Sequence, residues 1–108
     1  MHKIYKQLYE EIGKDKDLLE ELVSDFITIY QDNIEKLSRS ISKIAYGDIA
    51  FIAHKLKGSS MNFNIPKFTE AAQQLEDIGK NQLEKNMSKL FNIMEKEFDA
   101  FVDAKKEL

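Results

Sequence analysis

The feature that most constrains the fold is a long run of apolar residues, spaced three or four positions apart, between residues 16 and 45. Such spacing places every apolar side chain on one side of an α-helix, because the helix has 3.6 residues per turn. The members of this stripe are Leu19, Leu22, Phe26, Tyr30, Ile34, Leu37, Ile41 and Ile44. The run predicts one long helix whose apolar face must be covered by other parts of the chain.

Shorter patterns of the same kind predict four further helices, at residues 3–12, 49–63, 67–78 and 82–105. Gly13 is expected to end the first of these helices, and Gly79 to end the helix at 67–78. Gly47 should stop the long helix, and Asp48 should cap the next one. Short loops force neighbouring helices to run antiparallel. The predicted fold is therefore all-α, an antiparallel up-down four-helix bundle with a short extra N-terminal helix, formed by residues 1–108 as a single domain.

Composition excludes several classes of function. The chain has no cysteine, so it has no disulfide, no thiolate metal site and no cysteine nucleophile. Only His2 and His54 could supply imidazole ligands, and we expect no metal site. There is no glycine-rich phosphate loop or paired-carboxylate motif, so we expect neither an autonomous enzyme nor a cofactor.

Charge and hydropathy narrow the choice of partner. The net charge is −3, acidic and basic residues are interspersed, and Arg39 is the only arginine. Nucleic acid is not an expected partner, because binding phosphates requires clustered lysine and arginine. No apolar run approaches the roughly 18 residues needed to span a membrane, and there is no signal peptide. We expect a monomeric, cytoplasmic protein that does not bind membranes.

The helix predicted at 49–63 carries unusual residues on its outer side. On a helical wheel, His54 lies roughly 140° from the centre of the apolar face, and Lys57 lies about 60° nearer to it. Gly58 costs about 1 kcal/mol relative to alanine inside a helix, so its presence calls for a reason other than helix stability. Exposed apolar side chains near a functional residue indicate a docking patch. The candidates are Ala50, Phe51 and Met61, unless the first helix covers some of them.

A neutral imidazole is a nucleophile, and Lys57 can neutralise anionic charge beside it. With open access at Gly58, these groups describe a site that receives a phosphoryl group rather than one that performs hydrolysis. Each feature also has an ordinary explanation. An exposed His54 is more often a plain surface residue, and a glycine can mark a contact between helices. The residue pattern alone leaves both interpretations open.

The segment from His54 to Ser60 reads His-x-Leu-Lys-Gly-Ser-Ser, and it resembles the signature of histidine phosphotransfer (HPt) domains. The resemblance extends to Gly47, Asp48, Ile52 and Ala53 upstream, and to Phe68, Leu75 and Glu76 downstream. Such domains are four-helix bundles that carry phosphate between receiver domains, or from a kinase to a receiver. The resemblance implies a phosphorelay carrier that does not itself use ATP. Its partners would be response-regulator receiver domains, with a histidine kinase as an alternative donor.

By position, the resemblance makes His54 the phosphoacceptor and Lys57 the residue that balances the phosphoryl charge. Glu76 matches the position from which a Glu or Gln holds the imidazole in one tautomer. Gly58 would leave room for the active site of the receiver. These roles are expectations that follow from the resemblance.

One residue departs from the family pattern. Many members have glycine ten positions after the histidine, where this chain has Asn64. We expect Asn64 to keep the turn, because asparagine tolerates the left-handed conformation. The main rival interpretation is a helical-bundle adaptor that binds receiver domains or other signalling partners without carrying phosphate. A protein lying on a membrane surface is a weaker alternative, because the apolar stripes match one another and the net charge is negative.

Overall fold

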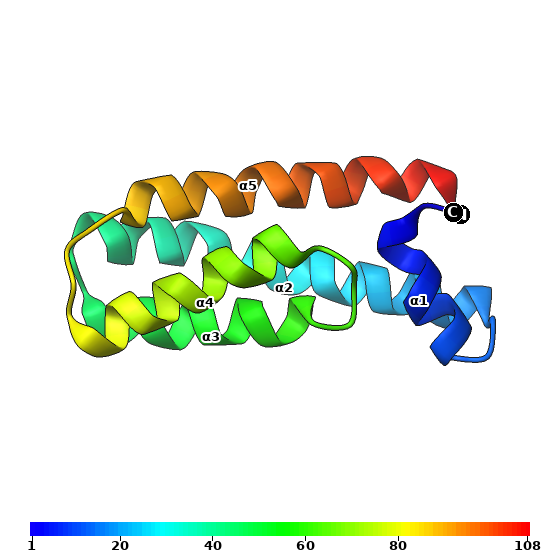
Figure 1. Cartoon of the computed structure of the whole chain (residues 1–108), viewed down its shortest axis with the longest axis horizontal. Helices are drawn as coiled ribbons and strands as arrows, with labels where there is room; N and C mark the ends of the chain where they lie inside the picture. The colour runs from blue at the N-terminus through cyan, green and yellow to red at the C-terminus, as the bar shows by residue number, and fades with distance from the viewer.

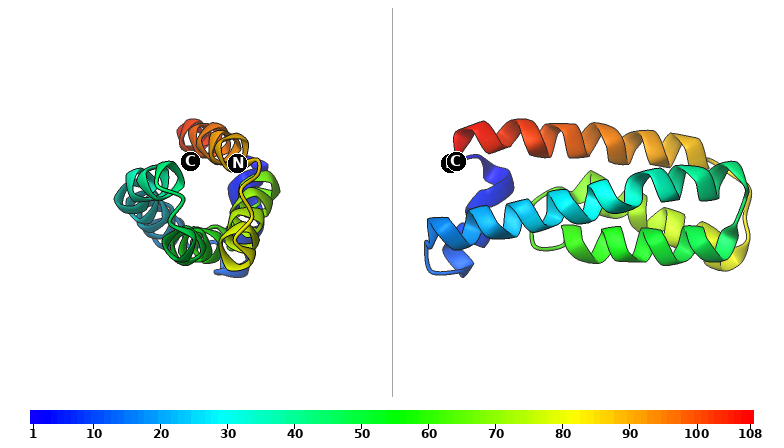
Figure 2. Two further views of the ribbon diagram at one scale, coloured as in Figure 1. Left: turned by 90° about the vertical axis from the view of Figure 1, so that its left-hand side faces the viewer. Right: turned by 180° about the vertical axis from the view of Figure 1, so that it is seen from behind.

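The computed structural model describes residues 1–108 and is entirely helical (Figure 1). The elements are α1 (Lys3–Glu11), α2 (Lys16–Ser42), α3 (Tyr46–Ser60), α4 (Pro66–Asn81), α5 (Met87–Ala104) and the 3-10 turn η1 (Lys105–Glu107). Viewed along the long axis, α2 to α5 surround a common centre (Figure 2), and α1 lies across one end. The predicted four-helix bundle with a short N-terminal helix is confirmed. No helix in the chain has both the length and the apolar character that a membrane span requires.

Aromatic rings fill the centre of the bundle. The ring of Phe26 on α2 is buried, and its centroid lies between 4.9 and 5.9 Å from four others: Phe63, Phe68, Phe98 and Phe101. Tyr5 of α1 packs edge-on against Phe63 and Phe101, and its hydroxyl donates to the carbonyl oxygen of Phe101. Edge-to-face contacts of this kind add to the free energy gained by burying the rings. The first helix therefore belongs to the same core as the bundle.

In the link between α1 and α2, Gly13 ends the first helix as predicted. Gly13 has φ +77°, the left-handed conformation that ends a helix, and the N–H of Lys14 donates to the carbonyl of Tyr9 at 2.8 Å. This is the pattern of a Schellman motif. Asp15 then caps α2, because its carboxylate accepts from the N–H of Leu18 at 3.0 Å.

The turn between α2 and α3 differs from the prediction. Helix α2 ends at Ser42, and the residue that reverses the chain is Ile44, with φ +53°. The N–H of Ala45 donates to the carbonyl of Ser40 at 2.9 Å, which again closes a Schellman motif. Gly47 and Asp48 therefore lie inside the first turn of α3, and neither stops nor caps a helix. Isoleucine is disfavoured in this conformation, so the sequence did not indicate it.

The loop after α3 also differs. The helix ends at Ser60 rather than at residue 63, and Asn64 does not adopt a positive φ. Instead, the backbone N–H of Asn64 donates to the carbonyl of Ile4 at 3.1 Å. The departure from glycine at this position is thus accommodated without a left-handed turn, and the loop is tied to α1.

Helix α4 continues through Gly79 to Asn81, where the prediction ended it at residue 78. The left-handed residue that ends it is Gln82, with φ +54°. A loop follows, and α5 begins at Met87 rather than at residue 82. Gly79 is therefore an internal helical residue, and its presence has a different cause from the one that the sequence suggested.

We predict that Phe26→Ala lowers the free energy of unfolding by about 3–5 kcal/mol, because it removes a ring at the centre of the aromatic core. Urea unfolding followed by circular dichroism measures this change. Phe51→Ala is the matched control: the same substitution at an exposed ring should change stability by no more than about 0.5 kcal/mol. Equal losses in the two variants would contradict this account of the core.

Candidate functional site

The site is built from two neighbouring helices, α3 and α4. His54 extends from α3, and its side chain is 67% exposed. Its Nδ1 lies 3.0 Å from Oε2 of Glu76 on α4. Because an ionised carboxylate can only accept, Nδ1 carries the proton of the neutral ring. The lone pair is then on Nε2, which is the nucleophilic nitrogen.

Glu76 is the buried member of the pair, with a side chain only 3% exposed. It meets two ammonium groups besides the imidazole. Nζ of Lys57 lies 2.8 Å from Oε1, and Nζ of Lys80 lies 2.7 Å from Oε2. A buried carboxylate requires such compensation, because removing a charge from water costs several kcal/mol. His54 and Lys80 thus share one oxygen, and Lys57 faces the other.

These neighbours hold the carboxylate in its ionised form. The ammonium groups of Lys57 and Lys80, with a smaller contribution from His54, outweigh the effect of burial. They lower the pKa of Glu76 from an ordinary 4.5 to about 2. Glu76 in turn raises the pKa of Lys80. The pair therefore keeps its charges across the physiological pH range.

Lys57 lies between the helices, whereas the helical wheel placed it on the outer side. Its side chain is 19% exposed, and Nζ donates to Oε1 of Gln73 at 2.9 Å in addition to pairing with Glu76. Gln73 is itself held by Asp77, to which its Nε2 donates at 2.9 Å. A long lysine stem can bend back along the surface, so its direction does not follow from the position of its Cα alone.

Lys80 was missed by the sequence analysis. It lies four residues after Glu76 on α4, and its side chain is 62% exposed. The signal was present, because residues i and i+4 are neighbours on a helix surface and a Glu followed by Lys at this spacing forms an ion pair. That pair becomes informative only once Glu76 is known to face His54.

The sequence was also compared with models of known protein families. The model of the Hpt domain matches residues 21–104, which is most of the chain. The chain belongs to the Hpt domain family. Hpt domains act as phosphocarriers in histidine phosphotransfer and have no kinase activity. No match to the chain was found among the curated proteins or among the solved structures.

Around the imidazole, this Hpt domain presents apolar side chains to solvent. Phe51 is 67% exposed and Met61 is 66% exposed, so α1 covers neither. The ammonium group of Lys55 lies 5.0 Å from the centre of the Phe51 ring. A Cβ atom added at Gly58 would meet no atom within 4 Å, so there is open space beside the helix at this position. Ala50 is half-buried, and it lies in the contact between α3 and α4.

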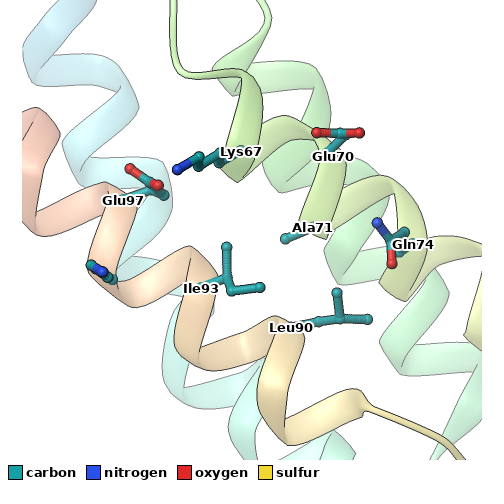
Figure 3. Close-up of a pocket in the computed structure, with 8 residues that line it drawn as sticks. Lys67, Glu70, Ala71, Gln74, Leu90, Ile93 and Glu97 are labelled. Carbon is teal, nitrogen blue, oxygen red and sulfur yellow. The ribbon is translucent and has the colours of Figure 1, made fainter.

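A hollow between α4 and α5 shares no residue with this site (Figure 3). Its floor is apolar, formed by Ala71, Leu90 and Ile93, with charged and amide groups around it. The chain has no group of three or more His, Asp or Glu residues placed to hold a metal ion.

We predict that Glu76→Gln lowers the free energy of unfolding by about 1–3 kcal/mol at pH 6, because it removes the charge shared by two ammonium groups. The folded-state pKa is depressed, so the contribution is present above pH 4.5 and is lost as the pH falls through about 2. The difference between the wild type and the variant should therefore shrink over this range. Urea unfolding at several pH values measures it.

The control is Glu70→Gln, on an exposed position of the same helix. It should leave stability nearly unchanged at each pH. A difference for Glu76→Gln that stayed constant from pH 6 to pH 2 would show that the charge of Glu76 is not what stabilises the site.

Proposed function

We propose that His54 accepts a phosphoryl group on Nε2 and passes it on within a two-component phosphorelay. The observation that supports this most is an exposed imidazole whose Nδ1 is bound to a buried, ionised carboxylate. That hydrogen bond keeps the lone pair on the solvent-facing side of the ring. The donors and acceptors we propose are aspartates of response-regulator receiver domains, with a histidine kinase as a second possible donor.

The chemistry is a simple exchange of bonds. The Nε2 lone pair attacks the phosphorus of an aspartyl phosphate on the receiver. An N–P bond forms, the acyl O–P bond breaks, and the aspartate leaves as a carboxylate. The ring keeps its Nδ1 proton and becomes cationic, and Glu76 stabilises that charge through the bond it already makes. Attack by a second aspartate on the phosphorus reverses these changes and restores the neutral ring.

We assign the two lysines different parts in this step. Lys57 matches the family position for balancing the phosphoryl charge, but its Nζ already lies within 2.9 Å of both Glu76 and Gln73. Its contribution is a fixed positive charge near the ring. Lys80 is more exposed, and it shares an oxygen with His54. It can turn toward a phosphoryl group on Nε2 and leave Glu76 compensated by Lys57 and the cationic ring.

The surface around His54 suits a receiver domain as partner. Gly58 leaves space for the partner's active site, and exposed apolar groups beside a functional residue are typical of a docking surface. We assign docking to Phe51, Met61 and Ala50. The same surface would also serve an adaptor that binds receivers without taking phosphate, and transfer assays distinguish the two.

We predict that the wild type takes up label from a phosphorylated receiver domain, in a form that is labile to acid and stable to base, and that His54→Gln does not. The matched control is His2→Gln, which removes the only other histidine and should take up label normally. The proposal fails if neither wild type nor variant is labelled, or if both are labelled equally. Binding of the receiver without transfer would favour the adaptor instead.

We also predict that Lys80→Gln slows transfer by about tenfold or more and lowers the free energy of unfolding less than Lys57→Gln does. Lys80 is exposed, whereas Lys57→Gln removes the partner of Oε1 inside the interface. Lys67→Gln, at an exposed position of α4, controls for the loss of one positive charge. Transfer by Lys80→Gln at the wild-type rate would remove Lys80 from the mechanism.

A further inference from the structure

Gly79 lies inside α4, and it is buried. A glycine inside a helix destabilises it relative to alanine, because the backbone loses more freedom on folding. Neither a helix end nor a positive φ accounts for Gly79, since α4 continues to Asn81 and only Gly13 among the glycines has a positive φ. Its reason must therefore lie in what the helix contacts.

The contact is with the backbone of α3. A Cβ atom on Gly79 would lie 2.6 Å from the nitrogen of Ala50, 2.7 Å from the carbonyl oxygen of Tyr46 and 2.8 Å from Cβ of Ala50. Two of these three atoms belong to the backbone, so no change of side-chain rotamer could make room. The helices would have to separate by roughly 1 Å before a methyl group reached ordinary van der Waals distance.

This close approach lies beside the functional site. Gly79 is three residues after Glu76, and Ala50 is four residues before His54, so each is about one turn from a member of the hydrogen-bonded pair. At the other end of α3, the hydroxyls of Ser60 and Thr69 are 2.8 Å apart and join the same two helices. The site therefore lies between two points at which α3 and α4 are held together.

We propose that Gly79 is a positioning residue that sets the distance between α3 and α4 so that Glu76 reaches Nδ1 of His54. With the Ser60–Thr69 contact in place, a side chain at Gly79 would separate the helices at the end nearer to Ala50. The bond from Nδ1 to Oε2 is 3.0 Å long, and a further separation of about 0.5 Å brings it to the limit for a hydrogen bond. The ring would then lose its fixed tautomer. The consequence for transfer rests on the function proposed above.

The first test is spectroscopic and requires no partner. Long-range proton–nitrogen NMR on protein labelled with nitrogen-15 reports which ring nitrogen of His54 carries the proton. The wild type should show the Nδ1-protonated tautomer predominantly, and Gly79→Ala should lose about half of that population or more. Gly47→Ala is the matched control, because a Cβ there meets no atom within 4 Å and the tautomer should not change.

The second test is phosphoryl uptake from phosphoramidate, a small donor that avoids the docking of a receiver. Uptake by Gly79→Ala should fall by about tenfold or more, because small displacements at a reacting centre have large effects on rate. Val23→Ala, in the buried face of α2, lowers stability without touching this contact. Val23→Ala should show the wild-type tautomer of His54 and the wild-type rate of phosphoryl uptake. This comparison separates positioning from a general loss of stability.

An unchanged tautomer in Gly79→Ala overturns the inference, whatever the uptake. If the wild type takes up no phosphoryl group from any donor, the proposed function fails, but a shifted tautomer in Gly79→Ala still supports the positioning role. If Gly79→Ala does not fold, Ala50→Val tests the same contact from α3 and should shift the tautomer in the same direction. A folded Ala50→Val with the wild-type tautomer would then overturn the inference.

Discussion

The rest of the site depends on the interactions that compensate the buried carboxylate of Glu76. A charge in this position is costly unless it is compensated, and the compensation comes from both helices: His54 and Lys57 on α3, and Lys80 on α4. Each of these groups is therefore fixed relative to the others by one anion. If the angle or spacing between α3 and α4 changed, these groups would move away from the carboxylate and leave its charge uncompensated.

The bundle meets this requirement by holding the two helices at a fixed separation. Gly79 permits backbone contact near Ala50, and the hydroxyls of Ser60 and Thr69 join the opposite end. The ring of Phe26 on α2 packs at the centre of the bundle against rings from α4 and α5. The part of the chain that matches the family begins at residue 21, yet Tyr5 of α1 completes the same core. The short first helix therefore supports the bundle rather than adding a separate unit.

Periodicity made the fold predictable, and the same periodicity placed His54 on the outer side of its helix. Helix ends were harder to predict, because Ile44 reverses the chain in a conformation that isoleucine rarely adopts. Gly79 was interpreted as a helix end, because glycine marks both ends and close contacts, and only the tertiary structure distinguishes them. The position of Lys57 was not predicted for a related reason: the path of its long side chain depends on Glu76 and Gln73 across the interface, which the sequence of α3 does not contain. The ion pair of Lys80 with Glu76 lies within α4, but its relevance to the site depends on Glu76 facing His54.

The choice of glutamate rather than an amide at position 76 affects more than the orientation of the ring. An amide oxygen could accept the hydrogen bond from Nδ1, but it would bring no charge. The two neighbouring lysines would then repel each other and, in the transfer proposed above, the cationic ring of His54. The carboxylate, with its pKa lowered to about 2, remains ionised wherever the protein is folded near neutral pH. It offsets positive charge from Lys57 and Lys80 in the resting state. In the transfer proposed above, it would also stabilise the ring of His54 when that ring becomes cationic, so that one anion serves the site before and after the phosphoryl group arrives.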